Sequence, residues 1–373
     1  MKGIFFHSHK FREIDGEYYS LGGLNDDVLS RYTKYFDELI VFARILKEDS
    51  SNKSKYSKIT DSKVKIYDYR KIKKSIIKNT IETSDAVIVR LPCFIGLKAI
   101  RFSIQKKKKY LTEVVACAWD SYWNHGILGK ILTPYIYMAT RKCIKNSTNV
   151  VYVSNSFLQK RYPSKGYCIG CSDVQLKKIS NDILERRLGR IKNERHNKKI
   201  ILGTIGAVDV KYKGQKYVIN AIKKLKKEGF INIEYQIVGS GDQSYLMNKA
   251  RKQGVSENIS FKGSLDHDSI FDWLDTIDIY IQPSLVEGLC RSLVEAMSRG
   301  CPCIASDAGG NVELIDKKYI FHKKNVNDLC KKIKIIMNDL EDASTYNFNK
   351  SEEFDCEKLK KKREKYYKEF ICN

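Results

Sequence analysis

The chain has 373 residues, of which 42% are hydrophobic and 30% are charged, a composition typical of a globular protein long enough for two domains. It contains no apolar run of about 18 residues, so we expect no helix that spans a membrane. Its start, MKGIFFHSHKF, lacks the basic residues and long apolar stretch of a secretory signal, which favours a cytoplasmic protein.

The net charge of +24 is concentrated in the first half of the chain. Residues 1–200 contain 40 Lys and Arg against 19 Asp and Glu, whereas residues 201–373 contain 28 against 25. A basic half joined to a nearly neutral half indicates that one domain faces something anionic. Nucleic acid and an anionic membrane surface are the two candidates, and a general excess of surface lysine is the third interpretation.

The eleven cysteines are scattered along the chain, with one CxxC pair (Cys168 and Cys171) and one CxC pair (Cys301 and Cys303). A structural zinc site needs four ligands, and neither pair has a second Cys or His pair nearby. We therefore expect buried thiols and no metal site.

In the first half of the chain, short β-branched and aromatic runs alternate with longer amphipathic runs, which are expected to form helices over 26–36 and 97–107. Strands separated by helices pair in parallel, so βαβ crossovers are expected. The expected strands are 4–7, 38–43, 64–67, 86–90, 111–116 and 150–154.

The second half repeats this alternation, with a helix expected over 215–228, where apolar side chains recur on one face. The expected strands are 199–203, 233–238, 258–261, 277–282, 303–306 and 319–321. Residues 186–199 contain few apolar side chains and are expected to link the two halves, and 352–371 form a charged terminal helix. The sequence thus predicts an α/β fold with Rossmann-like domains over 1–190 and 191–350 and a helical segment over 351–373.

Ligands of open α/β sheets bind beyond the carboxyl ends of the strands, and the glycine-rich and polar motifs fall in loops at such ends. Gly22 and Gly23 follow the first strand, and their backbone amides suit a phosphate. Another polar loop is expected after the strand over 111–116. It holds groups that bind sugars, namely Trp119, Asp120, Trp123, Asn124 and His125, although an aromatic core loop is an equal alternative for the tryptophans.

In the second half, Glu287 is expected in a loop after a strand, and Glu295 eight residues further on in a helix over about 289–299. A carboxylate accepts hydrogen bonds from two neighbouring hydroxyls, as on a ribose, and the helix start suits a phosphate. Lys213 precedes another helix, where its charge can neutralise a diphosphate leaving group. Gly309 and Gly310 are expected to expose backbone amides at a strand-to-helix turn.

Residues 201–315 resemble the donor-binding domain of the family 4 retaining glycosyltransferases. The resemblance runs through IGAVDVKYKG, QIVGSGD, ISFKGSL and PSLVEGLCRSLVEAMSRGCPCIASDAGGNVELI, in the family's order and spacing. It implies the GT-B fold, in which two Rossmann-like domains face each other across a cleft and a C-terminal helix packs back on the N-terminal domain. Residues 1–190 would then bind the acceptor and 191–350 the nucleotide sugar.

The resemblance also implies residue roles. Glu295 would bind the ribose, Glu287 would lie near the donor sugar or phosphate, and Lys213 would hold the diphosphate. Glu287, Lys213 and His125 are the expected catalytic residues. The expected donor-binding residues are Gly22, Gly23, Gly206, Lys211, Lys213, Gly239, Gly241, Gly263, Leu265, Glu287, Gly288, Leu289, Arg291 and Glu295.

One residue departs from the family pattern. Ala207 stands where the family often has an arginine, so Lys211 or Arg291 is expected to supply the missing charge. The resemblance implies no metal and no cofactor, only a UDP- or GDP-linked sugar as co-substrate.

The acceptor is expected to be a saccharide or a lipid-linked saccharide. Residues 97–109 and 127–145 mix apolar side chains with lysines as interfacial helices do, which predicts peripheral binding to the inner face of the cytoplasmic membrane. One alternative is another GT-B enzyme, such as a nucleotide-sugar epimerase. The other is a nucleic-acid-binding protein, although the basic residues of this sequence do not coincide with a known nucleic-acid-binding motif.

Overall fold

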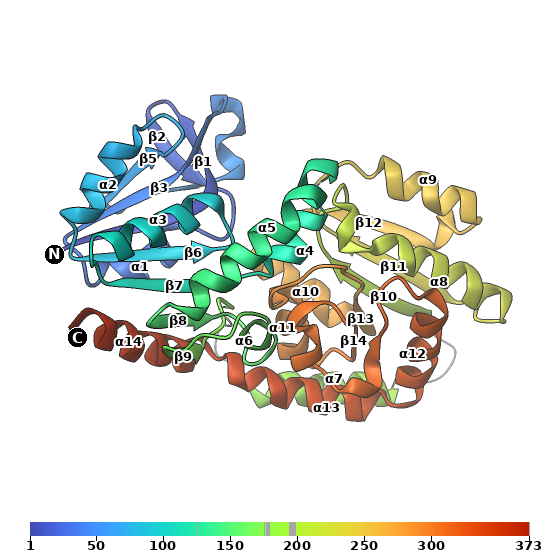
Figure 1. Cartoon of the computed structure of the whole chain (residues 1–373). Helices are drawn as coiled ribbons and strands as arrows, with labels where there is room; N and C mark the ends of the chain where they lie inside the picture. The colour runs from blue at the N-terminus through green and yellow to red at the C-terminus, as the bar shows by residue number, and fades with distance from the viewer. Residues whose placement is uncertain (125, 175, 177–179, 194–198, 373) are drawn as a thin grey trace. The chain divides into compact units, whose positions relative to one another are not determined.

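The structure is a computed structural model that describes residues 1–373 except 125, 175, 177–179, 194–198 and 373 (Figure 1). The chain forms two compact units. Unit 1 consists of residues 1–171 and 360–373, and unit 2 consists of residues 172–359. The expected boundary at 190 therefore lies inside unit 2, and the last part of the chain belongs to unit 1.

Unit 1 is built on a nine-stranded sheet in which β1 pairs in parallel with β3 and β6. Its order is β4-β2-β1-β6-β7-β8-β9, with β3 and β5 extending from β1. The strands are β1 (Lys2–Ile14), β2 (Glu17–Ser20), β3 (Glu38–Lys47), β4 (Ser57–Lys58), β5 (Val64–Asp68), β6 (Ala86–Leu91), β7 (Tyr110–Val114), β8 (Asn149–Tyr152) and β9 (Tyr167–Gly170).

The first strand differs from the prediction because it continues seven residues past its expected end at His7, to Ile14. It then turns through Asp15 and Gly16 into the antiparallel strand β2, so a hairpin precedes the first helix. The sequence did not predict this extension because it contains polar residues. Only the first part of the strand is a continuous apolar run, which is typical of buried parallel strands.

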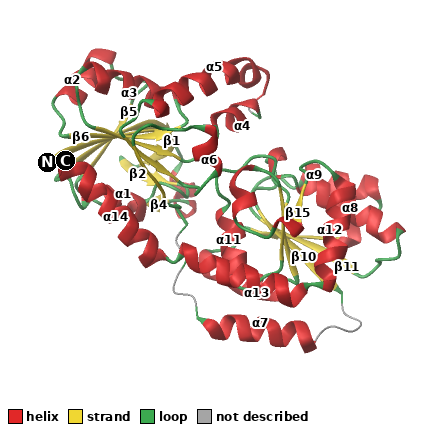
Figure 2. Cartoon of the chain, turned by 60° about the horizontal axis from the view of Figure 1, so that its bottom comes forward, coloured by secondary structure: helices red, strands yellow, loops and turns green. Residues whose placement is uncertain are grey.

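Helices cover both faces of the unit 1 sheet, α2, α3 and α5 on one face and α1 and α14 on the other (Figure 2). The helices are α1 (Asp26–Thr33), α2 (Lys74–Glu82), α3 (Phe94–Gln105), α4 (Ala118–Trp123), α5 (Gly126–Lys145), α6 (Phe157–Arg161) and α14 (Cys356–Cys372). The short 3-10 helix η1 is Ser50–Lys55.

The terminal helix α14 is held to unit 1 by its aromatic residues, as the resemblance implied. The Tyr366 hydroxyl donates to the carbonyl oxygen of Tyr167 at 2.7 Å, and the Tyr367 hydroxyl donates to the buried Glu113 carboxylate. Tyr367 also stacks on Tyr32 of α1, with 5.8 Å between ring centroids. The expected single helix over 352–371 is interrupted, since Glu352–Phe354 form the 3-10 turn η6.

Unit 2 is built on a six-stranded parallel sheet of order β12-β11-β10-β13-β14-β15. The strands are β10 (Ile200–Ile205), β11 (Ile233–Val238), β12 (Ile259–Gly263), β13 (Ile279–Gln282), β14 (Cys303–Ser306) and β15 (Ile320–Phe321). Each lies within two residues of its expected bounds. The buried runs at the middle of the sheet identify parallel strands covered on both faces.

The helices of unit 2 pack in two groups, since α8 contacts α9 and α12 while α13 contacts α7 and α11. They are α7 (Asn181–Asn193), α8 (Gln215–Lys227), α9 (Ser244–Gln253), α10 (His267–Thr276), α11 (Arg291–Ser298), α12 (Val326–Asn338) and α13 (Leu340–Ser351). The short 3-10 turns are η2 (Lys211–Lys213), η3 (Ser256–Asn258), η4 (Gly309–Glu313) and η5 (Lys317–Tyr319).

The prediction of a linker over 186–199 is wrong for its first part. Residues 186–193 belong to α7, and 194–198 lie outside the described residues. Arg187 is 5% exposed and donates to the carbonyl oxygens of Ile277 and Leu274, both at 2.7 Å. A buried arginine fixes this helix to the rest of unit 2. The sequence predicted a linker here because the segment is mostly polar.

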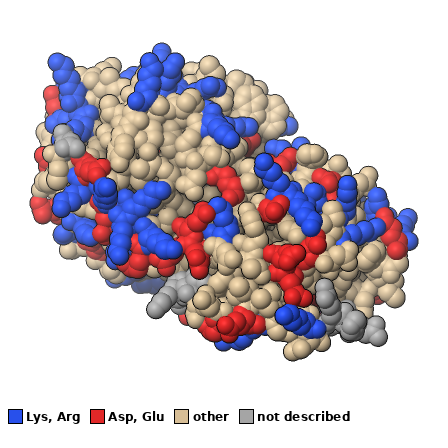
Figure 3. Space-filling model, turned by 90° about the horizontal axis from the view of Figure 1, so that it is seen from below, with Lys and Arg blue, Asp and Glu red and all other residues tan. Residues whose placement is uncertain are grey.

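The charge asymmetry persists when the observed units replace the halves of the chain. Residues 1–171 and 360–373 contain 37 Lys and Arg against 17 Asp and Glu, and residues 172–359 contain 31 against 27. Basic and acidic side chains are intermixed on the face seen in Figure 3.

Three further findings concern the cysteines, metal-ligating side chains and membrane-spanning helices. All eleven cysteines are free thiols. No group of metal-ligating side chains occurs in the described part of the chain. None of the described helices is both long enough and apolar enough to cross a bilayer.

Candidate active site

The loops that follow the parallel strands of unit 2 hold most of the residues expected to bind the donor. Gly206 follows β10, Gly239 and Gly241 follow β11, and Leu265 follows β12, which ends at Gly263. Glu287, Gly288 and Leu289 lie in the loop between β13 and α11. The carboxyl ends of neighbouring parallel strands share one edge of the sheet, so the topology gathers these loops where ligands of open α/β sheets bind.

Lys213 and Glu287, both expected catalytic residues, form an ion pair at this edge. The Lys213 Nζ lies 2.8 Å from Glu287 Oε1, and their side chains are 25% and 11% exposed. Burial opposes the charge on Lys213, but attraction to the Glu287 carboxylate outweighs it, so the pKa of Lys213 lies above its usual value. The lysine is therefore a fixed cation in a partly buried position.

A chain of hydrogen bonds between buried polar groups holds the Glu287 carboxylate in place. Tyr280 donates its hydroxyl to Gln282 Oε1 at 2.6 Å, and Gln282 Nε2 donates to Ser284 Oγ at 2.7 Å and to Glu287 Oε1 at 3.3 Å. This network fixes the carboxylate without neutralising it. The sequence prediction missed Tyr280 and Gln282, although a Gln that ends a buried strand is a signal for such a role.

Glu295 is placed differently from Glu287. It lies in α11 and is partly buried, and its side-chain carboxylate forms no hydrogen bond or ion pair with another described residue. Burial raises its pKa, while Arg291 and His267 act in the opposite direction. A partly buried carboxylate without a protein partner is suited to accept hydrogen bonds from the hydroxyls of a ligand.

Glycines let the loops of this edge pack closely on one another. A Cβ on Gly214, which has φ +79°, would lie 2.0 Å from the carbonyl oxygen of Pro283. A Cβ on Gly309, with φ +58°, would lie 1.9 Å from that of Glu287. The lysine and glutamate loops therefore tolerate no side chain at these two positions.

This packing corrects the prediction for Gly310, whose amide was expected to be exposed to an anion. The Gly310 amide donates to the carbonyl oxygen of Gly288 at 2.9 Å, and the segment forms only the short turn η4. Gly239 also serves loop packing, since a Cβ there would lie 2.2 Å from the carbonyl oxygen of Gly206.

The two residues expected to replace the missing arginine lie outside the ion pair. The Lys211 Nζ lies over the ring of Tyr245, 5.2 Å from its centroid, and Arg291 is exposed at the start of α11. At the position of Ala207, the carbonyl oxygen accepts a hydrogen bond from Gln215 Nε2 at 3.1 Å. Among the described cations, Lys213 is thus the one in direct contact with Glu287.

In unit 1, the aromatic segment expected as a loop is the short helix α4 instead. Trp119 and Trp123 are four residues apart on one helix face and stack with 5.5 Å between ring centroids. Asp120 pairs with Arg161 at 3.5 Å, and Asn124 Nδ2 donates to the carbonyl oxygen of Asp120. Trp123 remains 42% exposed, and the Lys130 Nζ lies over its ring, 5.9 Å from the centroid. His125 lies outside the described residues.

Gly22 and Gly23 lie in an exposed loop between β2 and α1. Gly22 has φ +76°, and a Cβ at either glycine would meet no atom within 4 Å. The loop therefore leaves open space for a ligand, although it follows a hairpin strand rather than the first parallel strand.

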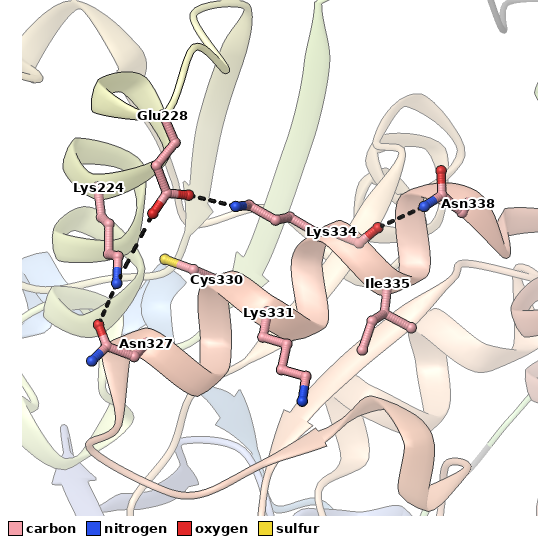
Figure 4. A pocket seen from close by; sticks show the side chains of 8 residues that line it. All are labelled: Lys224, Glu228, Asn327, Cys330, Lys331, Lys334, Ile335 and Asn338. Atoms are coloured by element: carbon pink, nitrogen blue, oxygen red, sulfur yellow. Dashed lines mark hydrogen bonds and ion pairs between the residues drawn. The ribbon is translucent and has the colours of Figure 1, made fainter.

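A separate groove of about 330 Å³ lies between α8 and α12 (Figure 4). Lys334 and Lys224 both approach Glu228, at 2.5 Å and 4.0 Å, so this carboxylate balances part of the lysine charge. None of the strand-end residues described above lines the groove. It is thus distinct from the candidate donor site.

Comparison with known proteins agrees with this arrangement. Residues 186–352 match the family described as "Glycosyl transferases group 1". Protein CapJ of Staphylococcus aureus is 35% identical over 346 residues, which cover 89% of this chain and 85% of CapJ. The capsular polysaccharide biosynthesis glycosyltransferase CapH of the same organism is 28% identical over 176 residues, 45% of each chain.

Among solved structures, Anabaena Alr3699/HepE in complex with UDP-glucose is similar with a TM-score of 0.66. The sequences are 15% identical over 99% of this chain and 100% of that chain. The two doubly wound sheets and this similarity define the GT-B fold. The chain belongs to the group 1 glycosyltransferases.

Proposed function

We propose that the chain is a metal-independent, retaining glycosyltransferase that acts in the synthesis of a cell-surface polysaccharide. The donor is a UDP- or GDP-linked sugar, the acceptor is a saccharide or lipid-linked saccharide, and no cofactor is needed. The observation that carries the proposal is the Lys213–Glu287 pair, whose members lie in the loops that precede α8 and α11, together with Glu295 on α11. The similarity to CapH, a glycosyltransferase of capsular polysaccharide biosynthesis, supports the polysaccharide role, and the UDP-glucose bound to HepE supports a nucleotide-sugar donor.

In the proposed reaction, the bond between the sugar C1 and the β-phosphate oxygen breaks, and the acceptor hydroxyl oxygen bonds to C1 on the same face. The hydroxyl proton passes to the departing phosphate oxygen. Negative charge develops on that phosphate, and the Lys213 ammonium stabilises it without the reorganisation that water would need.

Because Lys213 supplies the positive charge that stabilises the departing phosphate, we expect turnover to continue in EDTA. Turnover that EDTA abolishes and Mg²⁺ restores would contradict metal independence.

Glu295 provides a direct test of the donor site. A thermal-shift screen against UDP-, GDP- and ADP-linked sugars should identify a donor that raises the melting temperature. Replacing Glu295 by Gln should abolish most of this shift, because an amide accepts fewer hydrogen bonds from ribose hydroxyls than a carboxylate does. Replacing the exposed Glu257 of unit 2 by Gln is the control and should leave the shift unchanged. An unaltered shift in the Glu295 variant would refute its assigned role.

The raised pKa of Glu295 adds a pH dependence to donor binding. Burial favours the protonated carboxyl, so protonation begins at a higher pH than for a free glutamate. The carboxylate accepts the ribose hydroxyls, and donor affinity should therefore fall as pH decreases through this raised pKa. The Glu295→Gln variant, which cannot titrate, should show a flatter profile when affinity is measured by calorimetry at several pH values.

We further propose that unit 1 binds the cytoplasmic face of an anionic membrane through α5. The apolar side chains on this helix are unusually exposed: Ile127 is 78%, Leu128 76% and Ile131 68% exposed. The helix carries four basic residues and no acidic ones. An exposed apolar face flanked by lysines is typical of helices that lie in a membrane interface.

Acidic substitutions in the apolar face of α5 test membrane binding. Replacing Leu128 and Ile131 by Glu should reduce co-sedimentation with phosphatidylglycerol vesicles at low salt by about tenfold or more, because both hydrophobic burial and lipid attraction are lost. Replacing Ile231, which is 72% exposed in unit 2, by Glu is the matched control and should have little effect. Wild-type protein that stays in the supernatant would contradict the membrane proposal.

A further inference from the structure

The carboxyl ends of the unit 1 strands bring together a cluster of cationic and aromatic side chains that the sequence prediction did not identify. His7 and His9 lie in β1, Arg44 in β3, and Tyr69 directly after β5. The register between β1 and β3 shifts between Phe6 and Lys10, so the histidines lie in an irregular stretch of the strand. Such bulges redirect side chains and are common next to active sites.

His9 connects this cluster to the strand that leads to the Gly22 loop. Its Nε2 lies 2.9 Å from Ser20 Oγ, at the end of the strand that leads to the Gly22 loop, and its ring stacks on that of His7 at 6.4 Å. Burial and the charges of Arg90, Arg12 and Arg44 lower the pKa of His9 to about 4. The charged groups that act on this ring are therefore arginines, and the ring is neutral at neutral pH.

The three arginines differ in how their charge is balanced. Arg90 lies 3.6 Å from the Glu113 carboxylate, and Arg12 lies 3.6 Å from that of Glu48. Arg44 donates from Nε to the carbonyl oxygen of Ser8 at 2.8 Å, and it forms no ion pair with a carboxylate of the described residues. Its charge is thus the one left uncompensated at this edge, and it acts on Tyr69, Tyr122 and Cys93 as well as on His9.

We propose that this cluster, with Arg44 at its centre, binds a carboxylate or phosphate group of the acceptor, so that the enzyme prefers an anionic saccharide. The inference rests on the proposed function, because only a transferase has an acceptor. Arginine recognises both anions through paired hydrogen bonds, and tyrosine and neutral histidine side chains donate further ones. A neutral sugar would leave the Arg44 charge without a partner.

Histidine NMR tests the proposal without requiring the donor. The protein has six histidines, and the His9 resonance can be assigned from a His9→Gln variant. Methyl glucuronide or glucose 6-phosphate should shift this resonance and raise the pKa of His9, whereas methyl glucoside at the same concentration should not. The first two probes distinguish a carboxylate from a phosphate preference, and a response to either supports the proposal.

Substitution of Arg44 links the response to the cluster. Arg44→Gln should weaken binding of the anionic probe by about tenfold or more, and Arg44→Lys should restore part of it. Replacing the exposed Arg251 of unit 2 by Gln is the control. Since Arg44 also supports the bulge, the donor-induced thermal shift is measured on each variant and should be unchanged.

Two results would overturn the inference. One is an equal response to glucuronide and glucoside, since the site would then not select charge. The other is a His9 shift caused by UDP or GDP alone, with loss of donor binding in Arg44→Gln, which would assign the cluster to the donor diphosphate. A wild-type protein that binds no nucleotide sugar contradicts the proposed function alone, because the histidine response needs no donor.

Discussion

Replacing Lys213 by Ala should lower kcat by about two to three orders of magnitude, the usual effect of removing one preorganised group that stabilises transition-state charge. The ammonium lies 2.8 Å from Glu287, and without it that carboxylate would face the departing phosphate unopposed. The Michaelis constant for the donor should change less, because the charge on the phosphate grows only in the transition state. The release of nucleoside diphosphate measures both quantities.

Two comparisons make this prediction sharper. Lys227→Ala removes an exposed lysine from the far end of α8 and should leave kcat unchanged. In a double-mutant cycle with Glu287→Gln, the two effects should not add, because the pair acts as one unit. A kcat within about threefold of wild type in Lys213→Ala would contradict the assignment, since one lost donor of this kind costs far more.

Replacing Arg187 by Ala should lower the free energy of unfolding of unit 2 by about 3 kcal/mol, because buried carbonyl groups lose their donors. Its guanidinium donates to the carbonyl oxygens of Leu274, Ile277 and Arg299 at 2.7, 2.7 and 3.1 Å. Hydrogen exchange by mass spectrometry should show lost protection in α10 and β13, while the strands of unit 1 keep theirs.

The neighbouring Arg186 is the control for this change. Its side chain is 68% exposed and pairs with Asp182 on the helix surface. Arg186→Ala should change stability by about 0.5 kcal/mol or less, as exposed ion pairs on helices contribute little. Equal effects of the two substitutions would show that α7 is held by its surface charges rather than by the buried arginine.

The parallel strands of both units were predictable because they are buried on both faces. Continuous apolar runs such as those of β6, β13 and β14 are long enough to identify a strand, and the polar loops between them identify its end. The roles of the donor residues of unit 2 came from the family resemblance, and the strand pattern predicted their place, since Gly206 and Gly239 come directly after such strands and Glu287 lies in the loop after β13.

The features that escaped prediction depend on contacts between residues far apart in the sequence. The sequence predicted a linker in place of the second half of α7, because this helix is held by a buried arginine and not by a buried apolar side chain. The carbonyl groups that Arg187 contacts lie about 90 residues further along the chain. The cluster around Arg44 draws on β1, β3 and the residue after β5, and the sequence places its members too far apart to be recognised together. The partner of the Gly310 amide is the carbonyl oxygen of Gly288, which is recognised only when the loop of Glu287 is seen to pack on this turn.

The proposed function requires the enzyme to cleave a nucleoside-diphosphate sugar between C1 of the sugar and the β-phosphate. It is tested most directly by following, with ³¹P and ¹H NMR, the donor that the thermal-shift screen selects. Without an acceptor, water should slowly take its place, giving nucleoside diphosphate and a free sugar whose first-formed anomer has the configuration of the donor. A nucleotide sugar converted to its epimer, or a nucleoside monophosphate with sugar 1-phosphate, would contradict the claim.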